Sequence, residues 1–296
     1  MKLLVIIVTY NAMHWIKHCF DSLRSSTIHP TVYIVDNGST DGTQAYISTY
    51  YPQFIFFQSE QNLGFGAANN MGLKYALEYD FDYVYLLNQD AWVQSNTFEN
   101  LITISRDNPE FGLISPIQMN ADLYHIDKNF CVGLFKYQNK NFINDLYNET
   151  LNDIYETTPF VMAAHWFLTK SCIKKVGGFS PTFTHYGEDR NYADRIKYHG
   201  FKIGIAPKIK VVHDRGERSD PPKKIMKLNY ISLLVRCSDP VFSWSMFGKS
   251  LAISLYNGAK FYSLIPVFNF FKFLFNYFTI RRNKKISIKS ECAFLS

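Results

Sequence analysis

The sequence contains few cysteines, and their spacing excludes two common uses of that residue. The 296-residue chain has 5 cysteines, which are far apart and form no Cys-x-x-Cys pair: Cys19, Cys131, Cys172, Cys237 and Cys292. An odd number of scattered cysteines argues against a disulfide framework and against a structural zinc site. A reducing compartment is the simpler interpretation, so we expect a cytoplasmic location.

Long apolar runs are also missing. Nowhere do about 18 uncharged apolar residues follow one another, so the sequence predicts no transmembrane helix. The N-terminal run Leu3–Val8 is too short for the hydrophobic region of a signal peptide, and it lacks a small-residue cleavage site. We therefore interpret it as a buried first strand.

Clustered positive charge is absent from the early part of the chain. The formal net charge is +6 and the pI is about 8.9, a balance that fits nucleic acid, anionic lipid or a phosphate-bearing small substrate. No early Lys/Arg stripe resembles a nucleic-acid-binding surface, so we expect no nucleic-acid partner. The basic residues concentrate late in the chain, at Lys223, Lys224, Arg281, Arg282, Lys284 and Lys285.

The composition that is present is that of a globular protein, with 47% hydrophobic and 19% charged residues. Alternation of strand and helix patterns dominates the first ninety residues. Apolar, β-branched runs predict strands at Leu3–Thr9, Thr31–Val35, Phe54–Gln58 and Tyr83–Leu87. Between them, helical spacing predicts helices at Trp15–Ser25, Thr43–Tyr51 and Gly66–Tyr79. This order predicts an α/β fold with a doubly wound, mostly parallel sheet.

The rest of the chain is less regular. It predicts strands at Leu113–Ser115, Phe130–Phe135, Val161–Leu168 and Lys202–Val212. It predicts a loop over Asn139–Thr158, and helices over Lys170–Val176 and Gly187–His199. After a change of composition at Asp220-Pro221-Pro222, residues Lys223–Ile280 are expected to form a helical, Phe- and Tyr-rich extension.

Ligands of such sheets bind beyond the carboxyl ends of the strands, so the polar residues there are candidates for a site. Asp36 ends the second strand and can accept hydrogen bonds from a base or ribose, and the turn after it, which includes Ser39, supplies hydroxyl donors. The same turn is also explained by helix capping, which is the better interpretation of Asp41. Small residues at a helix start, such as Gly66, let a substrate approach the backbone.

Two acidic positions indicate catalysis. Asp90, in Asn88-Gln89-Asp90, follows a strand and fits a hard divalent ion shared with phosphates, although an isolated motif of this kind is more often a turn. Glu188 and Asp189 open a helix, where negative charge is favourable, and an adjacent acidic pair there suggests a general base. His213, at the end of a strand, can complete a metal shell or be merely structural.

Together these motifs resemble the family-2 inverting glycosyltransferases, particularly the rhamnosyltransferase-like branch. The matching segments are VIIVTYN, VDNGSTDGT, NLGFGAANNMG, YLLNQDA, VGGF and GEDRNYADRIKYHGFKI, which span roughly residues 3–215. The resemblance implies an A-type glycosyltransferase fold, a nucleotide-diphosphate sugar donor (UDP- or dTDP-sugar) and a glycan or lipid-linked acceptor, typical of bacterial surface polysaccharide synthesis. It also implies a catalytic domain over residues 1–219, divided into a donor half (1–110) and an acceptor half (111–219), before an extension over residues 220–296.

The resemblance assigns a role to each matching position. Thr9, Tyr10 and Asn11 line the nucleotide, Asp36 binds its base or ribose, and Asn69 and Asn70 lie near the nucleotide or sugar. Asn88-Gln89-Asp90 occupies the family's DxD position, with Asp90 as the acid that holds Mg²⁺ or Mn²⁺ and His213 as an added metal or phosphate contact. Asp189 matches the catalytic base.

Three departures from the family pattern qualify these roles. Asn88 replaces the first acid of the DxD motif, which leaves the metal one certain carboxylate. His165 and Trp166 occupy a segment that is usually small, where they shape an acceptor pocket or simply pack in a strand. Asn191 stands where a second acid is common, which weakens any role for it.

Several alternatives stay open at this level. A nucleotidyltransferase has the same nucleotide and metal needs, but it calls for a Gly-rich basic loop after the first strand, and Thr9–His14 lacks one. A non-catalytic sugar-nucleotide-binding protein is less consistent with intact Asp90 and Asp189. Two interpretations fit the aromatic and basic extension equally well. Its helices lie at the inner face of the cytoplasmic membrane, or they pack on the catalytic domain or on a second subunit in a homodimer.

Overall fold

The computed structural model describes residues 1–137, 140–157, 161–214 and 222–295. Its centre is a nine-stranded mixed sheet with the strand order β3-β2-β1-β4-β8-β6-β9-β5, and β7 pairs with β9 outside this path. The strands are β1 (Leu3–Thr9), β2 (Thr31–Asp36), β3 (Ile55–Gln58), β4 (Tyr83–Asn88), β5 (Ala91–Trp92), β6 (Phe111–Met119), β7 (Tyr155–Glu156), β8 (His165–Thr169) and β9 (Lys202–His213).

The first four long strands form the parallel half of the sheet, as the sequence predicts. Strands β2 and β4 flank β1 in parallel, and the register places Thr9 beside Asp36 and Val8 beside Asn88. Strand β1 is an almost continuous buried run because helices cover both of its faces. The polar residues after these strands therefore meet at one edge of the sheet.

Strand β8 continues the sheet in the opposite direction, since it pairs antiparallel with both β4 and β6. Strands β6 and β9 are parallel to each other, and β5 and β7 each add an antiparallel pair to β9. The second half of the sheet is thus mixed. It brings the end of β9 next to the residues that follow β4.

Helices form a layer on each side of the sheet. The first layer holds α1 (Ile16–Arg24), α2 (Thr43–Tyr50) and α4 (Thr97–Asp107), and the second holds α3 (Phe65–Glu78), α7 (Lys170–Val176) and α8 (Glu188–Tyr198). Each layer has its own apolar core, with Ile16, Phe20 and Phe98 on one side and Leu73, Ile173 and Tyr192 on the other.

Two predictions for the middle of the chain are wrong. Phe130–Phe135, predicted as a strand, belongs to helix α5 (Lys128–Tyr137), because Phe130 and Leu134 at helical spacing pack into the core and Asp127 Oδ1 accepts a hydrogen bond of 2.8 Å from the Phe130 amide. The predicted loop over Asn139–Thr158 contains helix α6 (Lys140–Tyr147) and β7. Asn139 and Thr158, the two ends of the predicted loop, lie outside the described residues.

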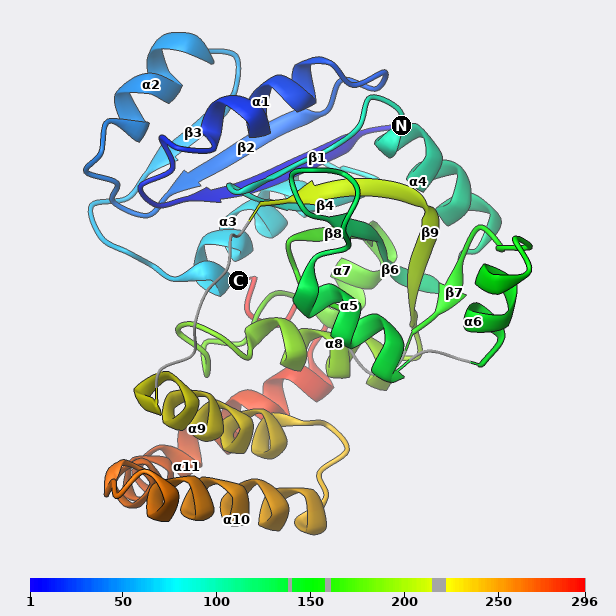
Figure 1. Ribbon diagram of the computed structural model, residues 1–296. Helices are drawn as coiled ribbons and strands as arrows, with labels where there is room; N and C mark the ends of the chain where they lie inside the picture. The colour runs from blue at the N-terminus through cyan, green and yellow to red at the C-terminus, as the bar shows by residue number, and fades with distance from the viewer. Residues whose placement is uncertain (138–139, 158–160, 215–221, 296) are drawn as a thin grey trace.

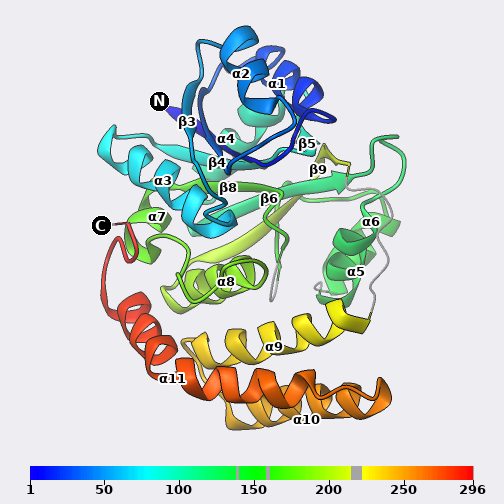
Figure 2. The ribbon, with the colours of Figure 1, turned by 90° about the vertical axis from the view of Figure 1, so that its left-hand side faces the viewer.

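The C-terminal extension is helical, as the sequence predicts. Helices α9 (Pro222–Ser238), α10 (Trp244–Lys260) and α11 (Ile265–Lys289) form a separate layer below α8, with α9 nearest the sheet domain (Figures 1 and 2). The expected boundary at Asp220-Pro221 lies outside the described residues. After α11 the chain returns to the sheet domain, where Gly178 N donates a 2.7 Å hydrogen bond to Ala293 O. Among the helices that the structure describes, none has the length and apolar character needed to cross a bilayer.

Candidate active site

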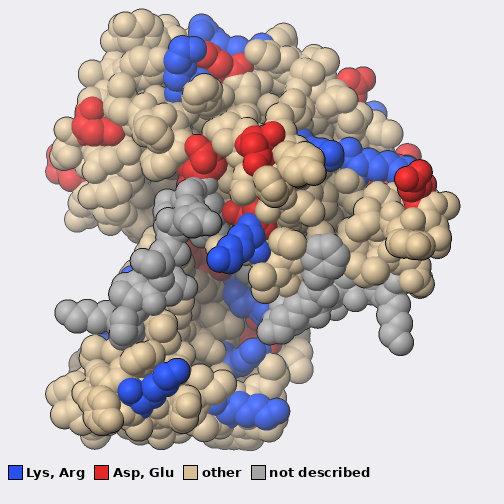
Figure 3. All heavy atoms as spheres, in the orientation of Figure 1, with Lys and Arg blue, Asp and Glu red and all other residues tan. Residues whose placement is uncertain are grey.

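A pocket of about 560 Å³ lies between the carboxyl edge of the sheet and helix α9. Five segments of the sheet domain line it: the start of α3, the end of β4, the residues before β8, the turn that leads into α8, and the end of β9. Helix α9 closes the remaining side with Leu228, Ile231, Ser232, Val235 and Arg236. The space-filling view shows the hollow between the sheet domain and the helical layer (Figure 3).

Asp36 does not line this pocket but organises the loops beyond β1 and β2. Its carboxylate is fully buried and accepts hydrogen bonds from the Thr9 hydroxyl (2.8 Å), the amides of Gly38 and Ser39 (3.1 and 2.8 Å), the Ser39 hydroxyl (2.5 Å) and the Gln44 amide group (2.6 Å). The Asp36 side chain therefore holds the turn in one shape. A role in contacting the base or ribose stays a prediction. Gln44 was not singled out from the sequence.

Two further interactions tie the strand ends together. Gln89 pairs with the Tyr10 backbone in both directions, accepting from Tyr10 N at 2.7 Å and donating to Tyr10 O at 3.2 Å. Asn11 N donates to the Ser39 hydroxyl at 2.8 Å, and Asn11 Oδ1 accepts from Thr40 N at 2.9 Å. The exposed Tyr10 and Asn11 are thus presented on a fixed backbone beside the Asp36 turn. Asp41 accepts from Thr43 N at 3.1 Å at the start of α2, in agreement with its interpretation as a turn residue.

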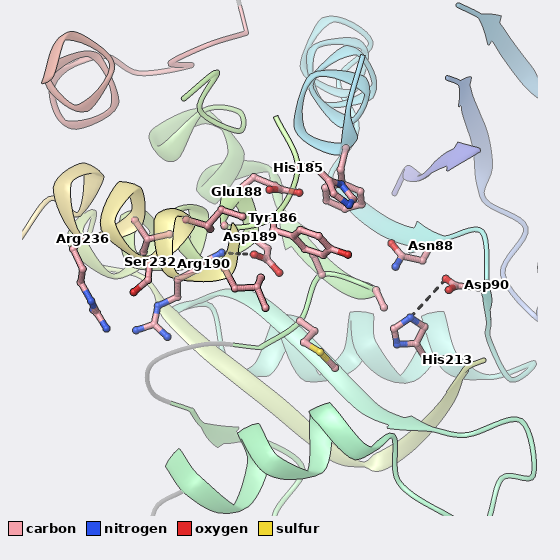
Figure 4. A pocket seen from close by; sticks show the side chains of 18 residues that line it. Asn88, Asp90, His185, Tyr186, Glu188, Asp189, Arg190, His213, Ser232 and Arg236 are labelled. Atoms are coloured by element: carbon pink, nitrogen blue, oxygen red, sulfur yellow. Dashed lines mark hydrogen bonds and ion pairs between the residues drawn. The ribbon is translucent and has the colours of Figure 1, made fainter. Parts of the chain in front are cut away.

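Asp90 and His213 face each other at one end of the pocket (Figure 4). Their nearest atoms, Asp90 Oδ1 and His213 Nε2, are 3.6 Å apart, and His213 Nδ1 is 4.0 Å from Asp127 Oδ2. The pairing of β5 with β9, in which Ala91 lies opposite His213, sets this arrangement. Asn88 lines the same end of the pocket.

These side chains fit a divalent cation only if a substrate completes its shell. An octahedral ion with ligands at about 2.1 Å holds neighbouring ligands roughly 3 Å apart, close to the Asp90–His213 separation. The buried His213 Nδ1 makes no hydrogen bond and lies 4.0 Å from Asp127 Oδ2, while Nε2 is the imidazole nitrogen that faces Asp90. Within the described residues, no group of three or more His, Cys, Asp or Glu side chains could hold a metal. A shared ion would therefore need phosphate oxygens.

The turn before α8 has an unusual backbone. Tyr186 and Gly187 are consecutive left-handed residues, with φ angles of 71° and 89°. A non-glycine residue rarely adopts this conformation, and such residues cluster at functional sites. The His185 and Tyr186 rings lie 4.0 Å apart, and Lys227 Nζ of α9 lies 5.3 Å from the Tyr186 ring centre. The turn directs Glu188 and Asp189 to the start of α8.

Glu188 and Asp189 differ in how far each carboxyl group is exposed to solvent. Glu188 is 6% exposed, and its Oε2 atom makes no hydrogen bond. Burial, and then the neighbouring Asp189 charge, raises the pKa of Glu188 to about 7. Asp189 is only half-buried and accepts a 2.7 Å hydrogen bond from Arg190 N at Oδ1. Both carboxyl groups line the pocket, and in Figure 4 Asp189 lies nearer its middle.

His165 and Trp166 require a correction, because the structure buries both completely. His165 shares a 2.7 Å hydrogen bond with the Tyr85 hydroxyl through Nδ1 and a 2.8 Å bond with Val212 O through Nε2. Trp166 Nε1 donates to Val161 O at 3.1 Å. They belong to β8 between two neighbouring strands, so they pack in the core and do not shape an acceptor pocket. The smaller Ala163 and Ala164 line the pocket instead.

Asn69, Asn70 and Gly66 are engaged within the protein. Asn69 Nδ2 donates to Phe65 O at 2.9 Å. Asn70 forms two hydrogen bonds with the Phe179 backbone, accepting from its amide at 2.6 Å and donating to its carbonyl at 2.9 Å. A Cβ atom on Gly66 would lie 3.0 Å from Phe179 Cβ, so the glycine allows α3 to approach this loop. Their predicted proximity to a nucleotide or sugar stays a prediction.

Helix α9 is the part of the site that sequence reasoning missed. Its apolar and basic composition gave no sign of a pocket wall. The one indirect signal is Gly187, whose missing side chain leaves room for α9. Arg190, from the start of α8, lines the same side of the pocket as Ser232 and Arg236 (Figure 4).

Comparisons with known proteins agree with this geometry. The sequence model of the family described as glycosyl transferase family 2 matches residues 4–177. The chain is 24% identical over 260 residues to N-acetylglucosaminyl-diphospho-decaprenol L-rhamnosyltransferase of Mycobacterium tuberculosis. The match covers 79% of this chain and 84% of that protein. It is 26% identical over 218 residues to the O-antigen chain rhamnosyltransferase RfbN of Salmonella typhimurium, and this match covers 72% of this chain and 66% of that protein.

A solved structure shows the same fold. S. aureus TarS 1–349 in complex with UDP-GlcNAc matches with a TM-score of 0.57 at 16% identity, and the match covers 89% of this chain and 74% of that one.

Proposed function

Since the chain belongs to glycosyl transferase family 2 and is a glycosyltransferase with an A-type fold, we propose that it inverts the anomeric centre of a donated sugar. The donor is a UDP- or dTDP-sugar, and the acceptor is a hydroxyl of a glycan or lipid-linked saccharide in bacterial surface polysaccharide synthesis. The activities named for the M. tuberculosis and S. typhimurium relatives, and the UDP-GlcNAc named for TarS, support this choice.

The arrangement of three groups around one pocket carries the proposal. Asn88, Asp90 and His213 lie at one end, Ser232 and Arg236 of α9 lie at the other, and Asp189 projects between them (Figure 4). The first end suits the diphosphate of a donor, and the α9 end suits an acceptor. The carboxylate between them is where an acceptor hydroxyl and an anomeric carbon must meet.

Asp189 is the proposed base. Its carboxylate takes the proton from the acceptor hydroxyl while that oxygen forms a bond to the anomeric carbon. The bond between this carbon and the diphosphate breaks in the same displacement, and the electron pair leaves with the nucleoside diphosphate. A single displacement from the opposite side inverts the anomeric configuration.

Glu188 supports this base and does not replace it. Because its pKa is about 7, it is partly protonated near neutral pH, which limits charge repulsion on Asp189. Its burial makes it less accessible to an acceptor than Asp189. We therefore assign the proton transfer to Asp189, and to Glu188 a role in tuning the charge beside it.

At the donor end, Asp90 and His213 would hold Mg²⁺ or Mn²⁺, with Asn88 beside them. Such an ion, when bound, offsets the negative charge that develops on a leaving diphosphate. The nucleotide would lie over Thr9, Tyr10, Asn11 and the Asp36–Ser39 turn, where Gln89 holds the Tyr10 backbone in place.

The experiment that tests the proposal compares Asp189→Asn with the wild-type chain in a screen of nucleotide-sugar donors. We expect the wild type to release nucleoside diphosphate, and the variant to lose roughly 10²–10⁴-fold in kcat while its donor affinity changes little. Release of pyrophosphate would show a nucleotidyltransferase. Undiminished turnover by Asp189→Asn would refute the assignment of the base.

A further inference from the structure

Helix α11 presents a row of exposed phenylalanines on the side that faces away from the protein. Phe268, Phe271, Phe275 and Phe278 recur at intervals of three and four residues and are 69%, 63%, 89% and 80% exposed. That spacing places all four on one face of the helix. The residues that α11 buries, among them Phe273 and Ile280, lie on the opposite face. The helix is apolar on both sides, but the protein covers only one.

Helix α10 carries the complementary pattern. The residues that it buries are small and four positions apart: Ser250, Ser254 and Gly258. A Cβ atom on Gly258 would lie 2.8 Å from Pro266 Cγ, so the two helices approach closely there. Most of the large side chains of α10 point outward, with Trp244, Ile253 and Tyr256 all exposed, whereas Phe247 packs against Phe273 of α11.

This distribution is the reverse of that in a water-facing helical hairpin. Helices that pack in water bury their large apolar residues, and exposed apolar patches of this extent mark interaction surfaces. Small residues between helices and large apolar residues outside are typical of helices in lipid. The turn between α10 and α11 continues the surface with Tyr262, which is almost fully exposed, and Leu264.

Charge separates this part of the chain from the rest. The chain has 31 Lys and Arg against 25 Asp and Glu, and residues 222–296 hold 12 of the basic residues but only 2 of the acidic ones. Residues 1–221 therefore carry 19 basic and 23 acidic residues, a slight negative excess. All of the net positive charge lies in the C-terminal helices. On α11 the phenylalanine face continues into Arg282 and Lys285, both exposed.

We infer that the outer face of α10 and α11 docks on an anionic membrane surface. The apolar residues run along the sides of the helices, so both helices lie flat with their aromatic side chains in the boundary between head groups and acyl chains. Arg282, Lys285 and the other basic residues of these helices bind lipid phosphates. This inference concerns binding and does not depend on which sugar the enzyme transfers.

A groove beside the same face suits a lipid. It has a volume of about 680 Å³ and is lined by aromatic side chains, including Phe242, Phe247 and Phe270, with Arg281, Lys284 and Lys285 at one side. Apolar walls next to clustered cations match an amphiphile whose anionic group is attached to an apolar chain.

A second copy of the chain fits this face less well. A symmetric dimer places the same patch of two copies face to face. Two segments that each hold 12 basic and 2 acidic residues would then repel each other. An anionic bilayer is complementary in charge as well as in apolar character.

The position of α9 links the membrane face to the pocket. Helix α9 packs against α10 and α11 on one side and lines the pocket with Ile231, Ser232 and Arg236 on the other (Figure 2). Packed helices are about 8–10 Å apart, so α9 and the α10–α11 pair together place roughly two helix thicknesses between the pocket and the proposed membrane surface. A docked enzyme would hold the acceptor side of its pocket facing the lipid head groups.

Flotation of the full chain with vesicles tests the inference. We expect it to float with vesicles of phosphatidylcholine and phosphatidylglycerol but not with phosphatidylcholine alone. Phe271→Ser/Phe275→Ser/Phe278→Ser should lose roughly 100-fold in affinity, and Arg282→Gln/Lys285→Gln roughly 30-fold. All five side chains are exposed, so folding should persist, which circular dichroism checks.

The matched control is Tyr147→Ser, which removes an aromatic side chain that is 88% exposed on α6 of the sheet domain. It should float like the wild type. Light scattering after gel filtration measures the oligomeric state and so tests the competing occupant, a second copy of the chain. Two results would overturn the inference. One is a wild-type dimer that becomes monomeric on the triple serine substitution, with neither protein floating. The other is equal flotation of the wild type and a folded triple variant.

Discussion

Gly187 lies so close to Ile231 that a Cβ atom added to it would come within 2.7 Å of Ile231 Cγ2. Gly187 precedes the Glu188–Asp189 pair at the start of α8, and Ile231 belongs to α9. The contact joins the acidic turn of the pocket to the C-terminal helices. The extension is therefore part of the pocket as well as an appended layer.

The first prediction is that Gly187→Ala lowers both stability and activity. Alanine would have to adopt a φ of +89°, which costs about 1–2 kcal/mol, and overpacking against Ile231 costs about 1–3 kcal/mol more. A shift of the acidic pair by about 1 Å would reduce turnover roughly 10²-fold. Urea unfolding and release of nucleoside diphosphate measure the two effects.

Gly200→Ala is the matched control for that substitution. Gly200 has a φ of +87°, yet nothing lies within 4 Å of its added Cβ. It should show only the backbone cost and keep full activity. Adding Ile231→Ala to Gly187→Ala should relieve the contact, so the two effects should not be additive. Equal losses in Gly187→Ala and Gly200→Ala would show that α9 does not press on the turn.

The second prediction concerns pH, because the folded protein raises the pKa of Glu188 from 4.5 to about 7. Between these values the folded state binds more proton than the unfolded state, so this group lowers stability as pH rises from about 4.5 to 7. Glu188→Gln should therefore be more stable than the wild type above pH 7, by at most roughly 3 kcal/mol. The gain should disappear below about pH 4.5.

Chemical unfolding at several pH values measures this difference. Glu78→Gln is the control, since it removes a carboxylate from the exposed end of α3. A Glu188→Gln variant whose stability relative to the wild type does not change with pH would show that Glu188 is not held in an environment that favours its protonated form.

Local sequence patterns were sufficient for the parallel half of the sheet and for the residues at its edge. Buried apolar runs define β1 and β4, and the register of parallel neighbours then places Asp36 and Asn88 at one edge. The position of the acidic pair, Glu188 and Asp189, could also be predicted from the sequence, because a turn before a helical pattern shows where α8 begins. These features depend on short segments and on rules that hold for most parallel sheets.

The remaining features depend on contacts between distant segments. His213 meets Asp90 only because β5 pairs with β9, which joins residues more than 120 positions apart. His165 is buried because β8 enters between β4 and β6, a position that its own sequence does not reveal. The wall formed by α9 is likewise a tertiary contact. Chain-local periodicity has no means of predicting any of these pairings.

The third prediction is that transfer depends on a divalent cation held at Asp90. Chelation with EDTA should abolish nucleoside diphosphate release, and Mn²⁺ or Mg²⁺ should restore it. Asp90→Asn should need at least roughly ten-fold more cation, since it removes the carboxylate that faces His213 at this end of the pocket. Asp122→Asn is the control, because Asp122 contacts His125 at 2.6 Å on the surface, outside the pocket. Full activity in EDTA would contradict the prediction.

The fourth prediction separates structural from ligand-binding roles for Asn70. Asn70→Ala removes both hydrogen bonds to the Phe179 backbone, which joins α3 to the loop before α8, and should cost about 1–3 kcal/mol of stability. Asn69→Ala removes one bond to Phe65 O within α3, so its cost should be smaller. If Asn70 acts only by holding that loop, KM for the donor should stay nearly constant in the folded Asn70→Ala variant. A rise in donor KM of about ten-fold without a loss of stability would instead place Asn70 in contact with the donor.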